Sequence, residues 1–178
     1  MEKLSSSIPT PSQQQQSFPS LGVKLVHLRR FVENCGGRQE LQGLTTTDVR
    51  DNFIIPMTLV ENNSYCEMLQ STSPEEVGEA NVFVSHAWKY TFLEVVDLLE
   101  NYFEKDKEDK EEGKENNNNQ ESKGNDKEED KNKETIIWFD IFSVNQHQQL
   151  EIDWFNTFKD AIESFGRTVM VLSPWQDP

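Results

Sequence analysis

The chain has 178 residues, which is enough for one domain and some additional polar sequence. Its formal net charge is −15, from 32 acidic and 17 basic residues. This balance argues against a general nucleic-acid or anionic-membrane surface, because both need clustered Lys and Arg. The two cysteines, Cys35 and Cys66, form no Cys-x-x-Cys pair, which argues against a structural zinc site and favours reduced thiols.

Nothing in the sequence predicts a membrane span or a secretion signal. No run of 18 apolar residues is present, and Met1 to Gly22 lacks the apolar core of a signal peptide. We therefore expect a cytoplasmic protein. Residues 1–22 are rich in Ser, Gln and Pro, and this composition predicts a disordered leader.

Residues 23–78 predict a helical extension ahead of the main domain. Apolar residues recur near a 3.6 period from Val23 to Cys35, with basic residues between them. This helix either packs on the domain, which we favour, or docks on acidic lipid or a partner. A second helix should run from Asp48 until Pro56 stops it, and a third should follow Ser64.

Three apolar runs predict a parallel sheet, and hence an α/β fold. They are Asn81 to Ser85, Ile136 to Phe139 and Thr168 to Leu172, and each is apolar at consecutive positions, as in strands buried on both faces. Helices are expected over Tyr90 to Phe103 and Asp153 to Phe165. Between them, residues 105–134 are nearly all Lys, Glu, Asp and Asn, and this composition predicts a disordered insertion.

Each predicted strand ends in polar residues, at the sheet edge where open α/β proteins bind ligands. These residues are Ser85, His86, Asp140 and Ser173. A hydrolase triad of His86, Asp140 and Ser173 is a weak alternative, because no Gly-x-Ser-x-Gly elbow surrounds either serine. A metal site of His86, His147 and Asp140 lacks ligand-spaced pairs. No glycine-rich phosphate loop follows a strand.

Several ordered motifs resemble the Toll/interleukin receptor (TIR) domain. That family's first strand ends in a Val-Phe-x-Ser-like sequence, its second in an aromatic residue and Asp, and an Ala-Ile helix leads to Val-x-Val-Leu-Ser-Pro. The match is closer to a TIR-like family of protist, algal and oomycete proteins with a Ser-His-Ala-Trp signature. The matching segments are Thr46 to Val49, Ser64-Tyr65, Val84 to Tyr90, Asp140 to His147 and Gly166 to Trp175. The resemblance covers most of Leu44 to Pro178.

The resemblance implies a flavodoxin-like parallel sheet and one of two functions. Some TIR-like domains cleave NAD, using a glutamate on the helix after the third strand, and others self-associate and recruit partners. Because the sequence stops at Pro178, before such a helix, we expect a partial TIR-like domain over residues 79–178 that is catalytically incomplete. Glu163, on the preceding helix, is a poor substitute.

A module of this kind would either bind NAD or a related nucleotide or act by homotypic self-association alone. An inert fragment of a larger protein is the third alternative. In the nucleotide-binding alternative, Trp88 would stack on a ring and Lys89 would meet a phosphate. The candidate ligand-binding residues are Ser85, His86, Trp88, Lys89, Asp140 and Ser173.

Overall fold

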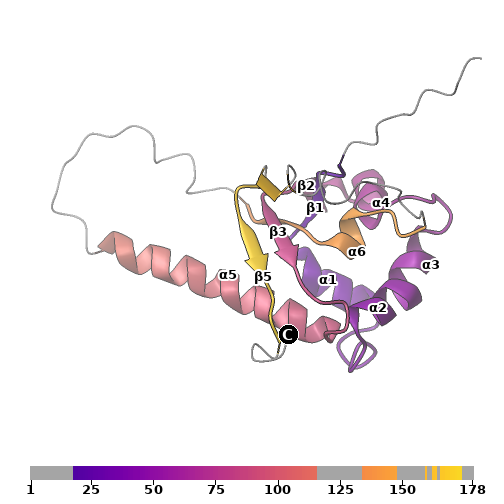
Figure 1. Cartoon of the computed structure of the whole chain (residues 1–178), viewed down its shortest axis with the longest axis horizontal. Helices are drawn as coiled ribbons and strands as arrows, with labels where there is room; N and C mark the ends of the chain where they lie inside the picture. The colour runs from indigo at the N-terminus through magenta and orange to yellow at the C-terminus, as the bar shows by residue number, and fades with distance from the viewer. Residues whose placement is uncertain (1–17, 116–133, 148–158, 160–161, 164, 174–178) are drawn as a thin grey trace, which may run out of the picture.

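The computed structural model describes residues 18–115, 134–147, 159, 162–163 and 165–173. Five strands of this part of the chain form one mixed sheet in the order β2-β1-β4-β3-β5 (Figure 1). The strands are β1 (Leu21–Lys24), β2 (Val77–Glu79), β3 (Val82–Ser85), β4 (Ile136–Trp138) and β5 (Thr168–Met170). The α/β class predicted from the sequence is therefore confirmed.

The three predicted strands are present and parallel, with β3 in the middle. Val82 pairs with Ile137 of β4, and Val84 pairs with Val169 of β5. All three apolar residues of β3 are buried, as expected for a strand covered on both faces. Val82 and Val84 belong to the main hydrophobic core, and Phe83 faces a second, smaller one.

The sheet gains two strands, added through antiparallel pairing, that the sequence did not predict. The helix expected from Val23 begins only at His27, as α1 (His27–Asn34), and the residues before it form β1. β1 lies between β2 and β4 and pairs with both, so tertiary hydrogen bonding overrides the helical spacing. The expected leader also ends earlier than Gly22, because Phe18 stacks on Trp138 with ring centroids 5.2 Å apart.

The expected stop at Pro56 is wrong, because the helix continues through it. α2 (Thr46–Val49), the π-helical turn η1 (Arg50–Ile54) and α3 (Ile55–Thr58) follow without a break. In η1 the Ile55 amide donates to the Arg50 carbonyl, five residues back. This wider turn accommodates a proline that has no amide hydrogen to offer. The next helix, α4 (Tyr65–Thr72), starts at Ser64 as predicted, with a capping box formed by Ser64 and Glu67.

The helix after β3 is longer than predicted. α5 (Phe92–Glu115) extends past Phe103 into the charged segment that was expected to be disordered, and it projects beyond the sheet (Figure 1). Lys and Glu are good helix formers, so a helix nucleated by packing of its first half propagates into them. Residues 116–133 of the predicted insertion lie outside the described residues.

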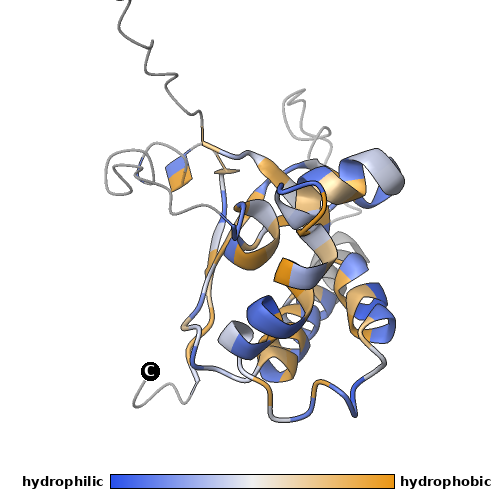
Figure 2. Ribbon diagram, turned by 90° about the vertical axis from the view of Figure 1, so that its right-hand side faces the viewer, coloured by the Kyte–Doolittle hydropathy of each residue, from blue (hydrophilic) through white to orange (hydrophobic). Residues whose placement is uncertain are grey.

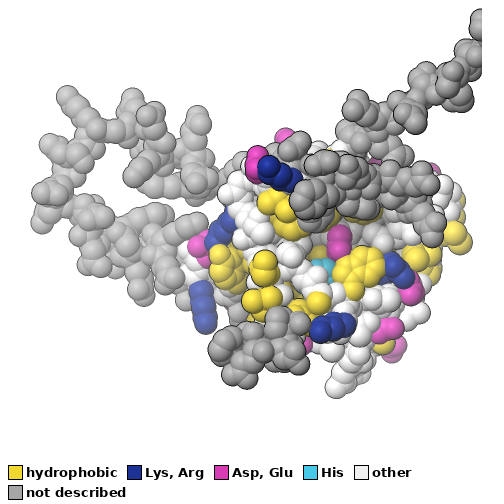
Figure 3. Space-filling model, viewed as in Figure 1, with side chains coloured by type: hydrophobic (Ala, Val, Ile, Leu, Met, Phe, Trp, Pro, Cys, Tyr) yellow, Lys and Arg dark blue, Asp and Glu magenta, His cyan; other side chains and the backbone are white. Residues whose placement is uncertain are grey.

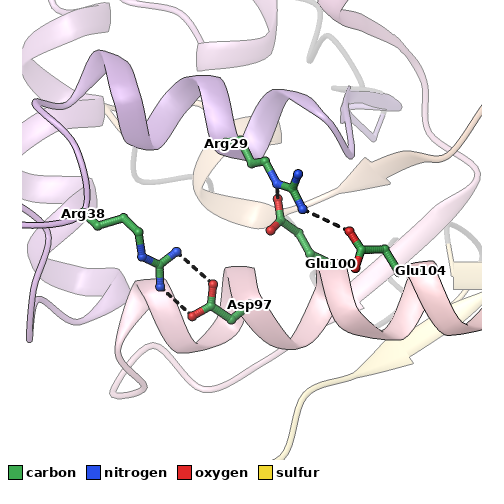
Figure 4. A network of polar contacts seen from close by, with 5 residues as sticks. All are labelled: Arg29, Arg38, Asp97, Glu100 and Glu104. Carbon is green, nitrogen blue, oxygen red and sulfur yellow. Dashed lines mark hydrogen bonds and ion pairs between the residues drawn. The ribbon is translucent and has the colours of Figure 1, made fainter.

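Ion pairs join the region of α1 to α5 (Figure 4). Arg29 donates to Glu100 at 2.7 Å and to Glu104 at 3.0 Å. Arg38, just after α1, forms a two-point pair with Asp97 at 2.9 and 2.6 Å. Since its basic residues are engaged within the chain, α1 is a helix packed on the domain, which was the favoured of its two predicted roles.

The sheet separates two cores of unequal size. Figure 2, which turns the sheet nearly edge-on, shows most of the described helices on one side of it. The other side holds an aromatic cluster of Phe83, Trp138 and Phe165, with Phe18 packed against it. Phe165 belongs to the expected 153–165 helix, whose described residues are helical and whose remainder lies outside the described part. None of the described helices is long and apolar enough to cross a membrane.

Candidate functional site

The carboxyl ends of β3, β4 and β5 lie together, as the parallel pairing requires. The Ser85 carbonyl at the end of β3 accepts from the Val171 amide just after β5, at 2.8 Å. Two residues after β4, Asp140 opens a short helix, α6 (Asp140–Ser143), which the sequence did not predict. In Figure 3 a histidine and an acidic side chain lie together at the surface of this face, with apolar and basic side chains beside them.

Asp140 and Trp88 form the central contact of this edge. The Trp88 indole Nε1 donates to Asp140 Oδ2 at 2.5 Å. Oδ1 of the same carboxyl accepts from the Ile141 amide at 2.8 Å. The carboxyl is largely shielded from water, and this burial raises the pKa of Asp140 to about 6, although the hydrogen bonds from Trp88 and Ile141 act in the opposite direction. Asp140 therefore changes its charge close to neutral pH.

His86 contributes a neutral imidazole to the same edge. Its ring meets that of Phe139 edge-on, with centroids 4.7 Å apart. Burial lowers the pKa of His86 to about 4. Nε2 is buried, and none of the described residues forms a hydrogen bond with it. A buried polar atom of this kind normally has a partner, so Nε2 is the natural contact for a ligand or an ordered water.

Two cations stand at the rim. The Arg50 guanidinium, from η1, lies over the Trp88 ring, 5.0 Å from its centroid. Arg50 also donates to Asp51 at 2.6 Å. Lys89 is exposed, directly after Trp88. The sequence pointed to Lys89 and missed Arg50, because no local pattern distinguishes an arginine that follows a helix cap from any other surface arginine.

Ser173 is held away from the Asp140 carboxyl. Its hydroxyl donates to Glu94 in the first turn of α5. Glu94 also accepts from the Thr91 hydroxyl at 3.2 Å. Ser173 therefore ties the end of β5 to the start of α5. Of the predicted site residues, Ser85, His86, Trp88 and Asp140 share the edge, Lys89 lies on its rim, and Ser173 has a structural partner.

The described residues form neither the hydrolase triad nor the metal site that the sequence analysis considered. Both oxygens of Asp140 and the Ser173 hydroxyl have other partners, so His86, Asp140 and Ser173 do not form a hydrolase relay. His147 Nε2 lies 2.8 Å from the Thr58 hydroxyl. Across the described residues, no group of three His, Cys, Asp or Glu side chains could hold a metal ion. Glu163 is exposed on the helical piece before β5.

The structure also holds a second polar cluster, which the sequence did not predict. His27 is buried between Glu76 and Tyr65, with each ring nitrogen 3.1 Å from its partner oxygen. Arg30 pairs with the other oxygen of Glu76. The cluster joins α1 to α4 and to the 3₁₀ turn η2 (Pro74–Glu76). Because His27, Tyr65 and Glu76 are buried and bonded to one another, with only Arg30 reaching the surface, the role of the cluster is to fix these elements.

Comparison with known proteins does not identify the chain. No family model matches it, and neither a curated protein nor a solved structure matches it. The resemblance to the TIR domain, read from the sequence motifs, thus stays a prediction. What the strand ends can bind follows from the side chains themselves: a buried carboxyl, a neutral imidazole, an indole and two cations at the rim.

Proposed function

We propose that this protein is a TIR-like signalling module with a flavodoxin-like core, and that it binds NAD or a related nucleotide at the carboxyl edge of β3, β4 and β5. The ligand's ring or ribose would meet His86 and Trp88, and its phosphates would meet Arg50 and Lys89. Asp140 acts through Trp88, whose indole it fixes.

The strand order supports the flavodoxin-like part of the proposal. The three parallel strands lie in the order β4-β3-β5 across the sheet. If they are renumbered 1 to 3 along the chain, this order is 2-1-3, which is how the flavodoxin-like sheet begins. In such a sheet the chain leaves its first strand in one direction for the second and crosses back for the third. The crevice at this switch point, outside the carboxyl ends, is where ligands bind. Here the switch point lies between β3 and β5, beside Ser85 and His86.

The observation on which the proposal rests is the buried Nε2 of His86, which has no hydrogen-bond partner among the described residues. It lies at the sheet edge where α/β folds bind ligands, and the same edge holds a carboxyl whose pKa is raised. Arg50, over the Trp88 ring, and the exposed Lys89 add positive charge to this region in a chain with a net charge of −15, which favours an anionic ligand. Because Arg50 already covers one face of Trp88, a base would stack on the other.

The test is calorimetric titration of the folded protein with NAD, ADP-ribose and ATP. We expect saturable binding of at least one of the three. His86→Ala should weaken it by about tenfold or more, the equivalent of about 1.4 kcal/mol. Lys89→Ala should weaken binding in a salt-dependent way, because its contact is electrostatic.

Lys105→Ala is the matched control, since Lys105 is also exposed but lies on the far half of α5. It should bind like the wild type. Absence of binding by all three nucleotides, with the circular dichroism of a folded protein, would overturn the proposal. Following nicotinamide release in the same samples tells whether NAD is also cleaved.

A second function, homotypic self-association, is favoured by the outer strand of the sheet. β5 pairs only with β3 among the described strands, and Met170 and Leu172 near its end are 63% and 46% exposed. An edge strand with exposed apolar side chains is a template for pairing with another chain. Light scattering behind size exclusion, comparing the wild type with Met170→Lys, tests this. A monomer at all concentrations would rule this function out.

A further inference from the structure

The connection between β3 and α5, residues 86–91, is anchored unevenly. Its second half is fixed by the backbone, because the Tyr90 carbonyl accepts from the Thr46 amide at 3.0 Å and the Phe92 amide donates to Leu44 at 2.9 Å. Thr91 also bridges to Thr45. In the first half, the His86 ring meets that of Phe139, and the Ala87 carbonyl accepts from the Tyr90 amide at 2.9 Å, a bond within the connection itself. His86 lies between Ser85, which is held by β5, and Trp88, so its position depends in part on what holds Trp88.

Trp88 is held from three sides. Its indole donates to Asp140 at the start of α6, and Arg50 lies over its ring. Its carbonyl accepts from the Thr47 amide at 3.3 Å. Of these contacts, the indole–carboxyl bond is the shortest, at 2.5 Å, and it alone ties the connection to the end of β4.

Among the described residues, the Asp140 carboxyl has dipolar partners and no paired cation. None of the ion pairs among the described residues involves Asp140. The charged and titratable groups on the elements around it are engaged elsewhere or stay neutral: Arg50 of η1 pairs with Asp51, Lys89 is exposed, His86 is uncharged, and His147 after α6 contacts Thr58. The negative charge of ionised Asp140 is therefore stabilised by hydrogen bonds from the Trp88 indole and the Ile141 amide.

We propose that the Trp88–Asp140 hydrogen bond is a proton-sensitive latch that regulates the candidate site: ionised Asp140 holds Trp88 and His86 in place, and protonation of Asp140 loosens them. The location and ligand of the regulated site rest on the proposed function, but the latch itself is a property of the free protein. A hydrogen bond to a carboxylate is roughly twice as strong as one to a neutral acceptor. When Asp140 takes up a proton, the Trp88–Asp140 hydrogen bond, which ties the connection to the end of β4, loses this additional strength.

The raised pKa of Asp140, about 6, puts the change within the range of cellular pH. Loosening of Trp88 frees the His86 end of the connection, while the Tyr90 end stays fixed by its backbone bonds. Acidification should therefore weaken ligand binding at the edge without unfolding the domain.

Nuclear magnetic resonance of the indole N–H groups tests the latch without any ligand. The chain has four tryptophans, and Trp88→Phe identifies the Trp88 signal. Between pH 8 and 4.5 we expect this signal to move upfield in the proton dimension, with a midpoint near pH 6, as its acceptor loses charge. Trp138 is the internal control, because its indole donates to the Pro19 carbonyl at 2.7 Å, an acceptor that does not titrate.

Two variants assign the titration. In Asp140→Asn the Trp88 signal should no longer titrate, whereas in His86→Gln it should titrate as in the wild type. A Trp88 signal that stays constant over this range in the folded wild type would overturn the latch. So would a titration that persists in Asp140→Asn or that Trp138 shares.

A binding arm separates this proposal from the proposed function. If NAD binds, its affinity should be severalfold lower at pH 5 than at pH 7.5 in the wild type, and nearly equal at both in Asp140→Asn. If no nucleotide binds but Trp88 titrates, the latch stands and the nucleotide proposal fails. If NAD binds and Trp88 does not titrate, the latch fails and the site stands.

Discussion

The phenol of Tyr65 lies 3.1 Å from Nε2 of His27, and both side chains are buried. The other ring nitrogen of His27 contacts Glu76, whose carboxylate also pairs with Arg30. A carboxylate only accepts hydrogen bonds, so Nδ1 must carry the proton and Nε2 must accept from the Tyr65 hydroxyl. Burial, with Arg30 contributing, lowers the pKa of His27 to about 4, which keeps the ring neutral in this arrangement.

Removing the Tyr65 hydroxyl should therefore leave a buried acceptor unsatisfied. We expect Tyr65→Phe to lower the free energy of unfolding by about 1–3 kcal/mol, the usual cost of such a group. Chemical denaturation at pH 7.5 measures it. Tyr102→Phe is the control, since that hydroxyl accepts from Arg167 at 2.8 Å but is exposed, and its loss should cost less than about 0.5 kcal/mol. Equal effects would show that the His27 contact contributes nothing specific.

The close approach of β1 to β4 predicts a strong effect at Gly22. A Cβ built there would lie 2.3 Å from the Ile137 carbonyl oxygen, which belongs to the backbone and cannot turn away. We expect Gly22→Ala to destabilise the protein by more than about 2 kcal/mol, as overpacking in a core does.

Gly78→Ala in β2 is the matched comparison. Its Cβ would meet only the end of the Ile136 side chain, at 2.8 Å, and that side chain can rotate. The loss should be clearly smaller than for Gly22→Ala when both are measured by thermal unfolding. A harmless Gly22→Ala would place β1 farther from β4 than the structure does.

The parallel core could be predicted from sequence because it is encoded locally. Val82, Phe83 and Val84 are consecutive, β-favouring and buried on both faces, and only a central strand accommodates such a run. β1 could not be predicted in the same way. Its residues Leu21 and Val23 continue into the helical spacing of α1, and what makes them a strand is pairing with residues more than fifty positions away.

The candidate site shows the same division. Ser85, His86 and Asp140 follow strand ends, so the sheet topology brings them together. The bond between Trp88 and Asp140 spans 52 positions, and the contact of Arg50 with Trp88 depends on a π-helical turn that no sequence pattern announced. The bond between Ser173 and Glu94 could not be read from the sequence either, because it joins residues 79 positions apart.

His86 should make the protein less stable in acid. The imidazole takes up a proton near pH 6.5 in the unfolded chain but only near pH 4 in the folded one. The unfolded state therefore binds more protons between these values, and stability falls as the pH drops through this window. The full shift corresponds to about 3 kcal/mol, at 1.36 kcal/mol per pKa unit.

His86→Gln removes this contribution. The difference in unfolding free energy between the variant and the wild type should shift in favour of the variant as the pH falls from 6.5 to 4. His27, with the same sign, stays in both proteins, so some acid sensitivity remains in the variant. A pH-independent difference would mean that His86 is open to solvent in the folded protein.

Asp140 should act in the opposite direction. Its pKa is about 6 in the folded protein and 3.8 for an aspartate open to water, as in the unfolded chain, so between these values the folded state holds a proton that the unfolded state has released. Stability must then fall as the pH rises through this window. The full shift corresponds to about 3 kcal/mol. We expect Asp140→Asn to be more stable than the wild type at pH 7.5, and this advantage to vanish near pH 4.

Asp48 is the control for that experiment, because its environment has the reverse effect. Hydrogen bonds from the Thr45 side chain and amide lower the pKa of Asp48, so its ionised form favours the folded state. Asp48→Asn should therefore lose stability relative to the wild type at neutral pH, and the loss should shrink in acid. Denaturation of both variants from pH 3 to 7.5 gives two difference curves of opposite sense in different windows: the Asp140→Asn curve should change between about pH 4 and 6, and the Asp48→Asn curve only below about pH 4. An Asp140→Asn curve that follows the Asp48→Asn curve would mean that the Asp140 carboxylate is stabilised by the fold, and the latch at Trp88 would then stay closed above about pH 4.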